Sequence, residues 1–169
     1  MLVLGIDPGT ATTGYGLVRE RCGKLECIGM GCVLTKAGTP LPERLESIFD
    51  QLSAIIADEK PDCAAVEKLF FNTNATSALA VGHARGVALL ACQRAGLPVA
   101  EYTPLQVKLA VAGFGRADKK QIQSMVKLLM SLPEEPKPDD AADALAIAIC
   151  HINTAPYFAR ACLDGDLRS

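Results

Sequence analysis

The stretch LVLGIDPG, residues 2–9, decides the fold of this chain. It starts as a short apolar run and is stopped by Asp-Pro-Gly, so we expect a buried β-strand that ends at Asp7. The next two segments, residues 13–20 and 25–34, alternate loosely and are joined through Cys22-Gly23-Lys24, which predicts a hairpin. The chain is therefore expected to open with three antiparallel strands.

After this hairpin, helices and apolar strands alternate. In order, we expect a helix from Pro40 and Pro42 to about Asp58, a strand at 63–66 that ends at Glu67, a helix at 75–95 closed by Gly96, a strand at 98–102, and then helices broken at 113–115 and 133–138. This order predicts an α/β fold with a mixed five-stranded sheet flanked by helices on both faces, the order found in ribonuclease H-like folds. We expect one domain over residues 1–156, followed by a C-terminal tail at 157–169.

The composition is that of an ordered α/β protein. Of its 169 residues, 50% are hydrophobic and 21% are charged, which suits one domain with a buried core and excludes a disordered chain. The apolar runs are shorter than the roughly 18 residues of a membrane span. Because Asp7 comes so early, with no basic segment before it, we expect no secretory signal. The seven cysteines lack a Cys-x-x-Cys arrangement, which favours free thiols in a reducing cytosol.

Charge is distributed unevenly along the chain. The net charge of −2 does not by itself indicate a nucleic-acid-binding protein. Residues 103–130 carry the basic side chains Lys108, Arg116, Lys119, Lys120 and Lys127 against one acid, Asp118. Residues 134–143 carry the acids Glu134, Glu135, Asp139, Asp140 and Asp143 against Lys137 alone. Two explanations stay open: two solvated faces, or cations for a DNA backbone beside carboxylates for metal ions.

Four carboxylates are candidates for a metal site: Asp7, Glu67, Asp140 and Asp143. Each also has a simple structural explanation. Asp-Pro-Gly forms a good turn, and Glu67 can mark the exit of a strand into solvent. Asp140 and Asp143 can complement the dipole at the start of a helix, for which Asp139 is expected to be the N-cap.

The combination of these residues favours a metal site. The helix that contains Asp140 and Asp143 is otherwise apolar all round through Cys150, so it should be buried, and no basic residue on it is spaced to pair with them. Asp7 and Glu67 end two apolar strands, and ligands gather beyond the carboxyl ends of strands in open α/β sheets. Four carboxylates meeting there would make a hard oxygen site suited to Mg²⁺.

Several motifs surround these carboxylates. They are Gly5-Ile6-Asp7-Pro8-Gly9-Thr10, Thr13-Gly14-Tyr15-Gly16, Val66-Glu67 with Phe70, Asn74-x-x-Ser77-Ala78-Leu79, Ala84-Arg85-Gly86-Val87-Ala88 and Asp140-Ala141-Ala142-Asp143-Ala144-Leu145-Ala146. In order and spacing, from residue 2 to about residue 151, they resemble the RuvC family of crossover junction endodeoxyribonucleases. By this resemblance, Asp7, Glu67, Asp140 and Asp143 take the places of the family's catalytic, metal-binding carboxylates.

The resemblance implies a bacterial, cytoplasmic endonuclease that resolves Holliday junctions in recombination and DNA repair by paired symmetric nicks. It implies hydrolysis with two Mg²⁺ ions per site, with Mn²⁺ as a substitute, and products with 5′-phosphate and 3′-hydroxyl ends. It further implies that Lys119 acts near the scissile phosphate and Lys108 at a second phosphate, although each lysine alone is also explained as a solvated charge. Arg116 and Lys120 of the same basic segment are further candidates for DNA contacts.

Two pairs of neighbouring residues leave an assignment open. By resemblance, Phe70 is the wedge that stacks on an unpaired base and holds the junction centre open, but Phe71 offers a second aromatic beside it. Asp139 likewise offers a second acid beside Asp140. In each pair the sequence leaves open which residue has the role.

A four-way junction has two-fold symmetry, which a C₂ homodimer matches directly. The helix at 75–95 has a ridge of small residues, Ala78, Gly82 and Gly86, that permits close approach of another element. This ridge either packs on the protein's own sheet or, as the resemblance implies, contributes to the dimer interface. The resemblance also implies cooperation with the RuvA–RuvB branch-migration complex and no membrane partner.

Three other functions account for parts of the sequence. Gly-Ile-Asp-x-Gly-Thr also resembles the phosphate loop of sugar kinases and other actin-like ATPases, but these need a second lobe for which the chain is too short. A non-catalytic module for branched DNA or RNA is disfavoured because all four carboxylates are present. An RNA-processing nuclease of the same fold would not explain the late match through Lys119 and Asp143.

Overall fold

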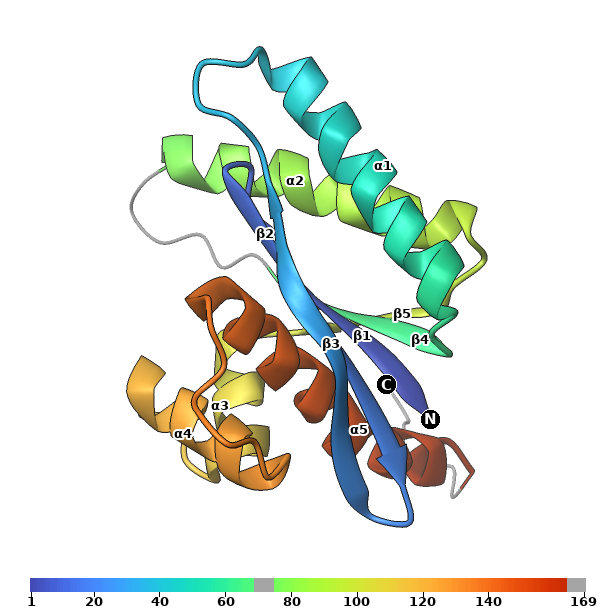
Figure 1. The fold of residues 1–169 in the computed structure, drawn as a ribbon. Helices are drawn as coiled ribbons and strands as arrows, with labels where there is room; N and C mark the ends of the chain where they lie inside the picture. Colours follow the sequence, from blue (N-terminus) through green and yellow to red (C-terminus); the bar gives the residue numbers. More distant parts are fainter. Residues whose placement is uncertain (69–74, 164–169) are drawn as a thin grey trace.

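The computed structural model describes the backbone of residues 1–68 and 75–163, and within it the side chains of residues 1–68 and 78–155. Its strands are β1 (Leu2–Asp7), β2 (Thr12–Arg21), β3 (Lys24–Leu34), β4 (Cys63–Glu67) and β5 (Val99–Tyr102). Its helices are α1 (Leu41–Glu59), α2 (Ala75–Arg94), α3 (Pro104–Ala112), α4 (Lys119–Leu129) and α5 (Asp139–Leu163). Together they make an α/β fold in which one sheet lies between two layers of helices (Figure 1).

The sheet is mixed and has five strands, as the sequence predicted, and their order is β3-β2-β1-β4-β5. β2 pairs antiparallel with both β1 and β3, whereas β4 pairs parallel with both β1 and β5. In this register Asp7 lies opposite Gly14 of β2, and Ile6 is paired with Val66 of β4. β1 and β4 therefore end at the same edge of the sheet.

Helices cover both faces of the sheet, and each layer has its own core. α1 and α2 pack on one face, around buried residues that include Ile6 and Val66 (Figure 1). α3, α4 and α5 pack on the other face, around Val3 and Ala65. Because side chains alternate along a strand, the next residue of β1 or β4 points to the opposite helix layer.

The expected elements are confirmed, with one correction at the start of α5. Asp139 is the first residue of that helix and not its N-cap. The carbonyl of Pro138 accepts from the N–H groups of Ala141 and Ala142, at 3.1 and 3.2 Å, so Pro138 fills the cap position. α5 also continues past Tyr157 to Leu163, and the division into a domain and a tail stays a prediction.

Six cysteines have described surroundings, and all six are free thiols: Cys22, Cys27, Cys32, Cys63, Cys92 and Cys150. Cys92 and Cys150 are buried, where a thiol packs as a small apolar side chain. In the part of the chain that the structure describes, no helix has both the length and the apolar character needed to cross a membrane.

Candidate active site

Asp7 and Glu67 are brought together by side-chain alternation on neighbouring strands. Ile6 and Val66 are buried against α1 and α2, so the residues after them point to the α5 layer. β1 and β4 run parallel and are paired at Ile6 and Val66, so Asp7 and Glu67 follow side by side at the end of the ladder. The topology therefore places two carboxylates at one sheet edge and on one face.

Close contact between α5 and the sheet brings in the other two carboxylates. Three glycines of β1 and β2 lie beneath α5: Gly5, Gly14 and Gly16. A Cβ atom on Gly5 would collide with the backbone of Ala144, and one on Gly14 would collide with the carbonyl of Asp140. Only glycine leaves room for a helix backbone at this distance. Asp140 consequently lies over β2, next to the strand that carries Asp7, and Asp143 follows about one turn later.

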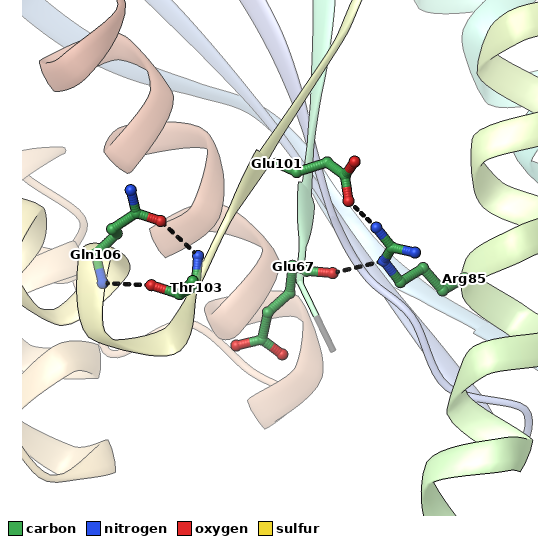
Figure 2. Close-up of polar contacts among 5 residues, drawn as sticks. All are labelled: Glu67, Arg85, Glu101, Thr103 and Gln106. Atoms are coloured by element: carbon green, nitrogen blue, oxygen red, sulfur yellow. Dashed lines mark hydrogen bonds and ion pairs between the residues drawn. The ribbon is translucent and has the colours of Figure 1, made fainter. Parts of the chain in front are cut away.

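The start of α4 carries Lys119, whose ammonium group lies beside the carboxylates. Lys119 is the first residue of this helix, directly after a capping box in which Asp118 accepts from the N–H of Gln121 at 2.9 Å. α3 begins in the same way, with Thr103 and Gln106 bonded to each other through side chain and backbone (Figure 2). Capping boxes fix where a helix starts. Ion pairs of Lys119 with Asp139 and Asp143 join this first turn of α4 to the start of α5.

These elements enclose a cleft of about 220 Å³. Its charged lining residues are Asp7, Glu67, Asp143, Lys108 and Lys119. Asp140 does not line the cleft, but it is close enough to Asp7 to raise the pKa of that carboxyl. Asp7, Glu67, Asp140 and Asp143 therefore share one neighbourhood, as the sequence analysis expected.

Lys119 pairs with two carboxylates of α5. Its Nζ atom lies 3.0 Å from Oδ2 of Asp143 and 3.3 Å from Oδ2 of Asp139. Asp139 also accepts a hydrogen bond from Nε2 of Gln123, at 2.9 Å, and this bond together with Lys119 lowers the pKa of Asp139. Asp139 is exposed, whereas Asp140 is partly buried. Of the two neighbouring acids, Asp140 is the one whose charge raises the pKa of Asp7.

The four carboxylates of the site outnumber the two lysines, Lys108 and Lys119, that could neutralise them. Burial, together with the charges of Glu67, Asp143 and Asp140, raises the pKa of Asp7 to about 7. Burial and Asp143 raise the pKa of Glu67 as well. Burial also raises the pKa of Asp143, even though Lys119 acts to lower it. Like charges crowded in a partly buried site destabilise their ionised forms unless a cation is added.

This excess charge is the observation that fits a divalent cation. Carboxylate oxygens in a partly buried cleft are the ligands that Mg²⁺ prefers. As they stand, no three His, Cys, Asp or Glu side chains among the described residues are arranged to hold an ion. The donor set is thus chemically suited to Mg²⁺, and the carboxylates lie near one another without forming a closed ligand shell.

The other predicted contact residues fall into three groups. Lys108 is half-buried in the cleft wall, whereas Arg116 and Lys120 are exposed and outside the cleft lining. Phe70 and Phe71 lie outside the described residues. The three small residues of α2 lie away from its buried side: Ala78 and Gly82 are partly exposed and Gly86 is exposed. They do not belong to the core that α2 forms with the sheet.

Comparison with known protein families covers nearly the whole chain. The profile of the family described as "Crossover junction endodeoxyribonuclease RuvC" matches residues 3–151. The chain belongs to the RuvC family. A family member from Desulfitobacterium hafniense (strain DSM 10664 / DCB-2) is 58% identical over 154 residues, 91% of this chain and 93% of that relative. The RuvC protein of Chloroflexus aurantiacus (strain ATCC 29366 / DSM 635 / J-10-fl) is 59% identical over 160 residues, 95% of this chain and 98% of that relative.

The RuvC fold is also found in solved structures. The structure described as "T. thermophilus RuvC in complex with Holliday junction substrate" matches with a TM-score of 0.88 and 38% identity, over 94% of this chain and 96% of that one. The uncomplexed Thermus thermophilus RuvC structure matches with a TM-score of 0.86 over 94% of this chain. The ribonuclease H-like fold expected from the strand order is therefore confirmed.

Sequence reasoning missed two features of this RuvC site. It did not recognise that Gly5, Gly14 and Gly16 share one face, although period-two spacing within each strand was a usable signal. It also did not notice the ion pair between Arg85 of α2 and Glu101 of β5. Glu101 was the available signal there, because it is an acid in an otherwise apolar or aromatic strand.

Proposed function

We propose that this RuvC-family protein is a structure-selective endonuclease that resolves Holliday junctions in recombination and DNA repair by paired symmetric nicks. The single observation that carries the proposal is the charge of the cleft. Three of its lining residues are carboxylates, a fourth carboxylate acts on Asp7 from beside it, and two lysines lie in its wall. Carboxylates can hold metal ions, and the metal ions together with the lysines can bind the negatively charged phosphodiester. Such a site therefore suits metal-dependent cleavage of a phosphodiester.

The metal proposed for the site is Mg²⁺, two ions per site, with Mn²⁺ as a substitute. Asp7, Glu67, Asp140 and Asp143 would hold the ions, and the charges of the other three carboxylates all act on Asp7. When bound, Mg²⁺ supplies an activated water and stabilises the departing 3′-oxygen, which gives 5′-phosphate and 3′-hydroxyl ends. Lys119, which pairs with Asp143, would hold the scissile phosphate.

The DNA contacts would extend outward from the cleft. Lys108 lies in the cleft wall and is proposed to bind a second phosphate. Arg116 and Lys120 are exposed and would reach the backbone further away, where an electrostatic contact needs no burial. Phe70 or Phe71 would stack on a base at the junction centre. These assignments rest on the family motifs and the position of the cleft.

Two active sites are needed for two symmetric nicks, so we propose a homodimer. Its interface would be the outer side of α2, where Gly86 is exposed and a Cβ atom there would meet no other described part of the chain within 4 Å. Two exposed apolar side chains flank this glycine, Leu79 at 63% and Leu90 at 52% exposure. Close helix approach over small residues with apolar neighbours is a suitable dimer contact. Cooperation with a RuvA–RuvB branch-migration complex in a bacterial cytoplasm belongs to the same proposal.

The test is cleavage of a synthetic four-way junction in Mg²⁺. We expect paired, symmetric nicks from the wild-type protein and none without the metal. Asp7→Asn should still bind the junction but should not cut it, because the side chain keeps its size and loses its charge. Junction binding without cleavage by the wild-type protein would indicate a non-catalytic module, and unchanged nicking by Asp7→Asn would contradict the metal assignment.

A further inference from the structure

Arg85 of α2 contacts the strand end that carries Glu67. Its Nε donates to the backbone carbonyl of Glu67 at 3.2 Å, and its Nη2 pairs with Oε2 of Glu101 (Figure 2). The side chains of Arg85 and Glu101 are only 21% and 33% exposed. One guanidinium thus joins α2, β4 and β5 at the edge of the sheet.

The carbonyl of Glu67 needs this donor because the sheet does not provide one. The N–H groups of Ala64 and Lys68 donate to β5, at Pro98 and Tyr102, so the backbone groups of Glu67 point to β1 instead. Continuing the parallel register one step beyond Ile6 and Val66, the donor on β1 would be the N–H of residue 8. That residue is Pro8, which has no N–H. Arg85 supplies the missing hydrogen bond.

Arg85 and the carboxylate of Glu67 lie on opposite faces of the sheet. Glu101 points to the α2 side, because Ala100 and Tyr102 before and after it pack in the α5 layer. The Glu67 side chain points the other way, into the cleft (Figure 2). Arg85 therefore touches only the backbone of Glu67, and it leaves the carboxylate free for a ligand in the cleft.

A partly buried ion pair is weak evidence for a role in stability. Desolvation offsets much of the attraction between Arg85 and Glu101, and apolar residues of similar size often stabilise a fold as well or better. What such a pair can provide is a fixed position for the groups that it contacts. Here the contacted group is the last residue of β4, whose carboxylate is repelled by Asp143.

We propose that Arg85, held by Glu101, is a positioning residue that fixes the end of β4 so that the Glu67 carboxylate can bind metal. The proposal rests on the proposed function, because it assigns Glu67 to the metal site. Arg85→Lys should impair the site, since one ammonium cannot bond the Glu67 carbonyl and the Glu101 carboxylate with the same two-armed geometry. Glu101→Gln should have a smaller effect, because the amide oxygen can still accept from Arg85.

The experiment measures Mn²⁺ binding to the DNA-free protein by electron paramagnetic resonance, together with the Mg²⁺ dependence of junction cleavage. We expect Mn²⁺ to bind Arg85→Lys about 10-fold or more weakly, the range seen when residues that support a metal ligand are changed. Excess Mg²⁺ should restore much of the cleavage rate, and junction binding in EDTA should not change. Arg94→Lys is the matched control: an exposed arginine at the end of the same helix, where no effect is expected.

Wild-type protein that neither binds Mn²⁺ nor cuts junctions would overturn the proposed function. Wild-type protein that does both, beside an Arg85→Lys variant with unchanged Mn²⁺ affinity, would overturn the positioning role alone. If Arg85→Lys is poorly folded in thermal melts, Glu101→Met decides, because methionine has a similar length but no oxygen to hold Arg85: weaker Mn²⁺ binding at an unchanged melting temperature supports the role, and unchanged binding refutes it.

Discussion

At the scale of single residues, Asp7 has the most strongly shifted pKa of the four carboxylates. Its pKa is raised from an ordinary value near 3.8 to about 7, first by burial and then by Glu67, Asp143 and Asp140. Between these values the folded protein binds a proton at Asp7 that the unfolded chain does not bind. The stability of the metal-free protein should therefore fall as the pH rises from about 4 to about 7.

Asp7→Asn should remove this pH dependence, because the amide has no charge to bury. The shift corresponds to at most about 4 kcal/mol at pH 8, and relaxation of water and neighbours makes about 1–3 kcal/mol a better expectation. Without metal at pH 8, the variant should melt a few degrees above the wild type, and the two should converge near pH 4. Saturating Mg²⁺ should raise the melting temperature of the wild type more than that of the variant. A variant less stable than wild type at pH 8 would show that burial and the neighbouring carboxylates do not destabilise ionised Asp7.

Lys119 should separate metal binding from catalysis. Its ammonium partly neutralises Asp143 and Asp139, so Lys119→Met makes the cleft more negative. Metal affinity in the DNA-free protein should then stay the same or rise, while junction cleavage falls about 10²-fold or more because a cation at the scissile phosphate is lost. Calorimetric Mn²⁺ titration and single-turnover cleavage test the two halves. Lys24→Met, at the exposed first residue of β3, is the control for loss of one surface charge.

At the scale of elements, the contact between α5 and the sheet should be the most sensitive to added volume. Gly14→Ala places a methyl group against the backbone of Asp140, so α5 must move away from β2. We expect a loss of about 1–3 kcal/mol of folding free energy and weaker metal binding, because Asp140 and Asp143 move with the helix. Gly29→Ala is the matched control, since its methyl group would lie 3.6 Å from Leu17 in ordinary contact. Equal effects of the two substitutions in urea melts and Mn²⁺ titrations would contradict this view of the glycines.

Sequence reasoning found these elements because their signals are local. The run before Asp7, the hairpin at residues 22–24 and the apolar face of α1 each depend on a few neighbouring residues. It also pointed to the four candidate carboxylates, whose role stays a prediction, since strand ends and one acidic turn on an apolar helix can be read from one segment at a time. The cap of α5 was misassigned because Asp139 has a good capping side chain, yet Gln123 and Lys119 of α4 hold that side chain instead.

What sequence reasoning did not find depends on pairings between distant segments. The role of Arg85 appears only when β1 is placed beside β4, because then Pro8 stands where the donor for Glu67 is needed. The glycines beneath α5 likewise have a reason only when α5, more than a hundred residues away along the chain, is laid across them. A single sequence does not specify such long-range registers, whereas the folded sheet does.

At the scale of the whole molecule, the decisive prediction concerns the number of active sites that act together. Gly86→Arg introduces a long charged side chain at an exposed position where a Cβ atom would meet no other described part of the chain within 4 Å. The monomer should therefore still fold, but a second α2 helix could no longer approach closely. Light scattering after size-exclusion chromatography should show a dimer for the wild type and a monomer for Gly86→Arg. Gln51→Arg, at an exposed position of α1, makes the same charge change away from the proposed interface and should remain dimeric.

The same variants predict different products from a supercoiled plasmid with an extruded cruciform. Two coordinated nicks during one encounter linearise the plasmid, whereas a single active site releases a nicked circle. Wild type and Gln51→Arg should yield mainly linear DNA at early times, and Gly86→Arg should yield mainly nicked circles at a lower rate. A Gly86→Arg protein that remains dimeric and still linearises the plasmid would place the interface elsewhere than on the outer side of α2. Because the cleft with the candidate carboxylates lies on the opposite side of the sheet from α2, such a result would leave the assignment of the four carboxylates intact.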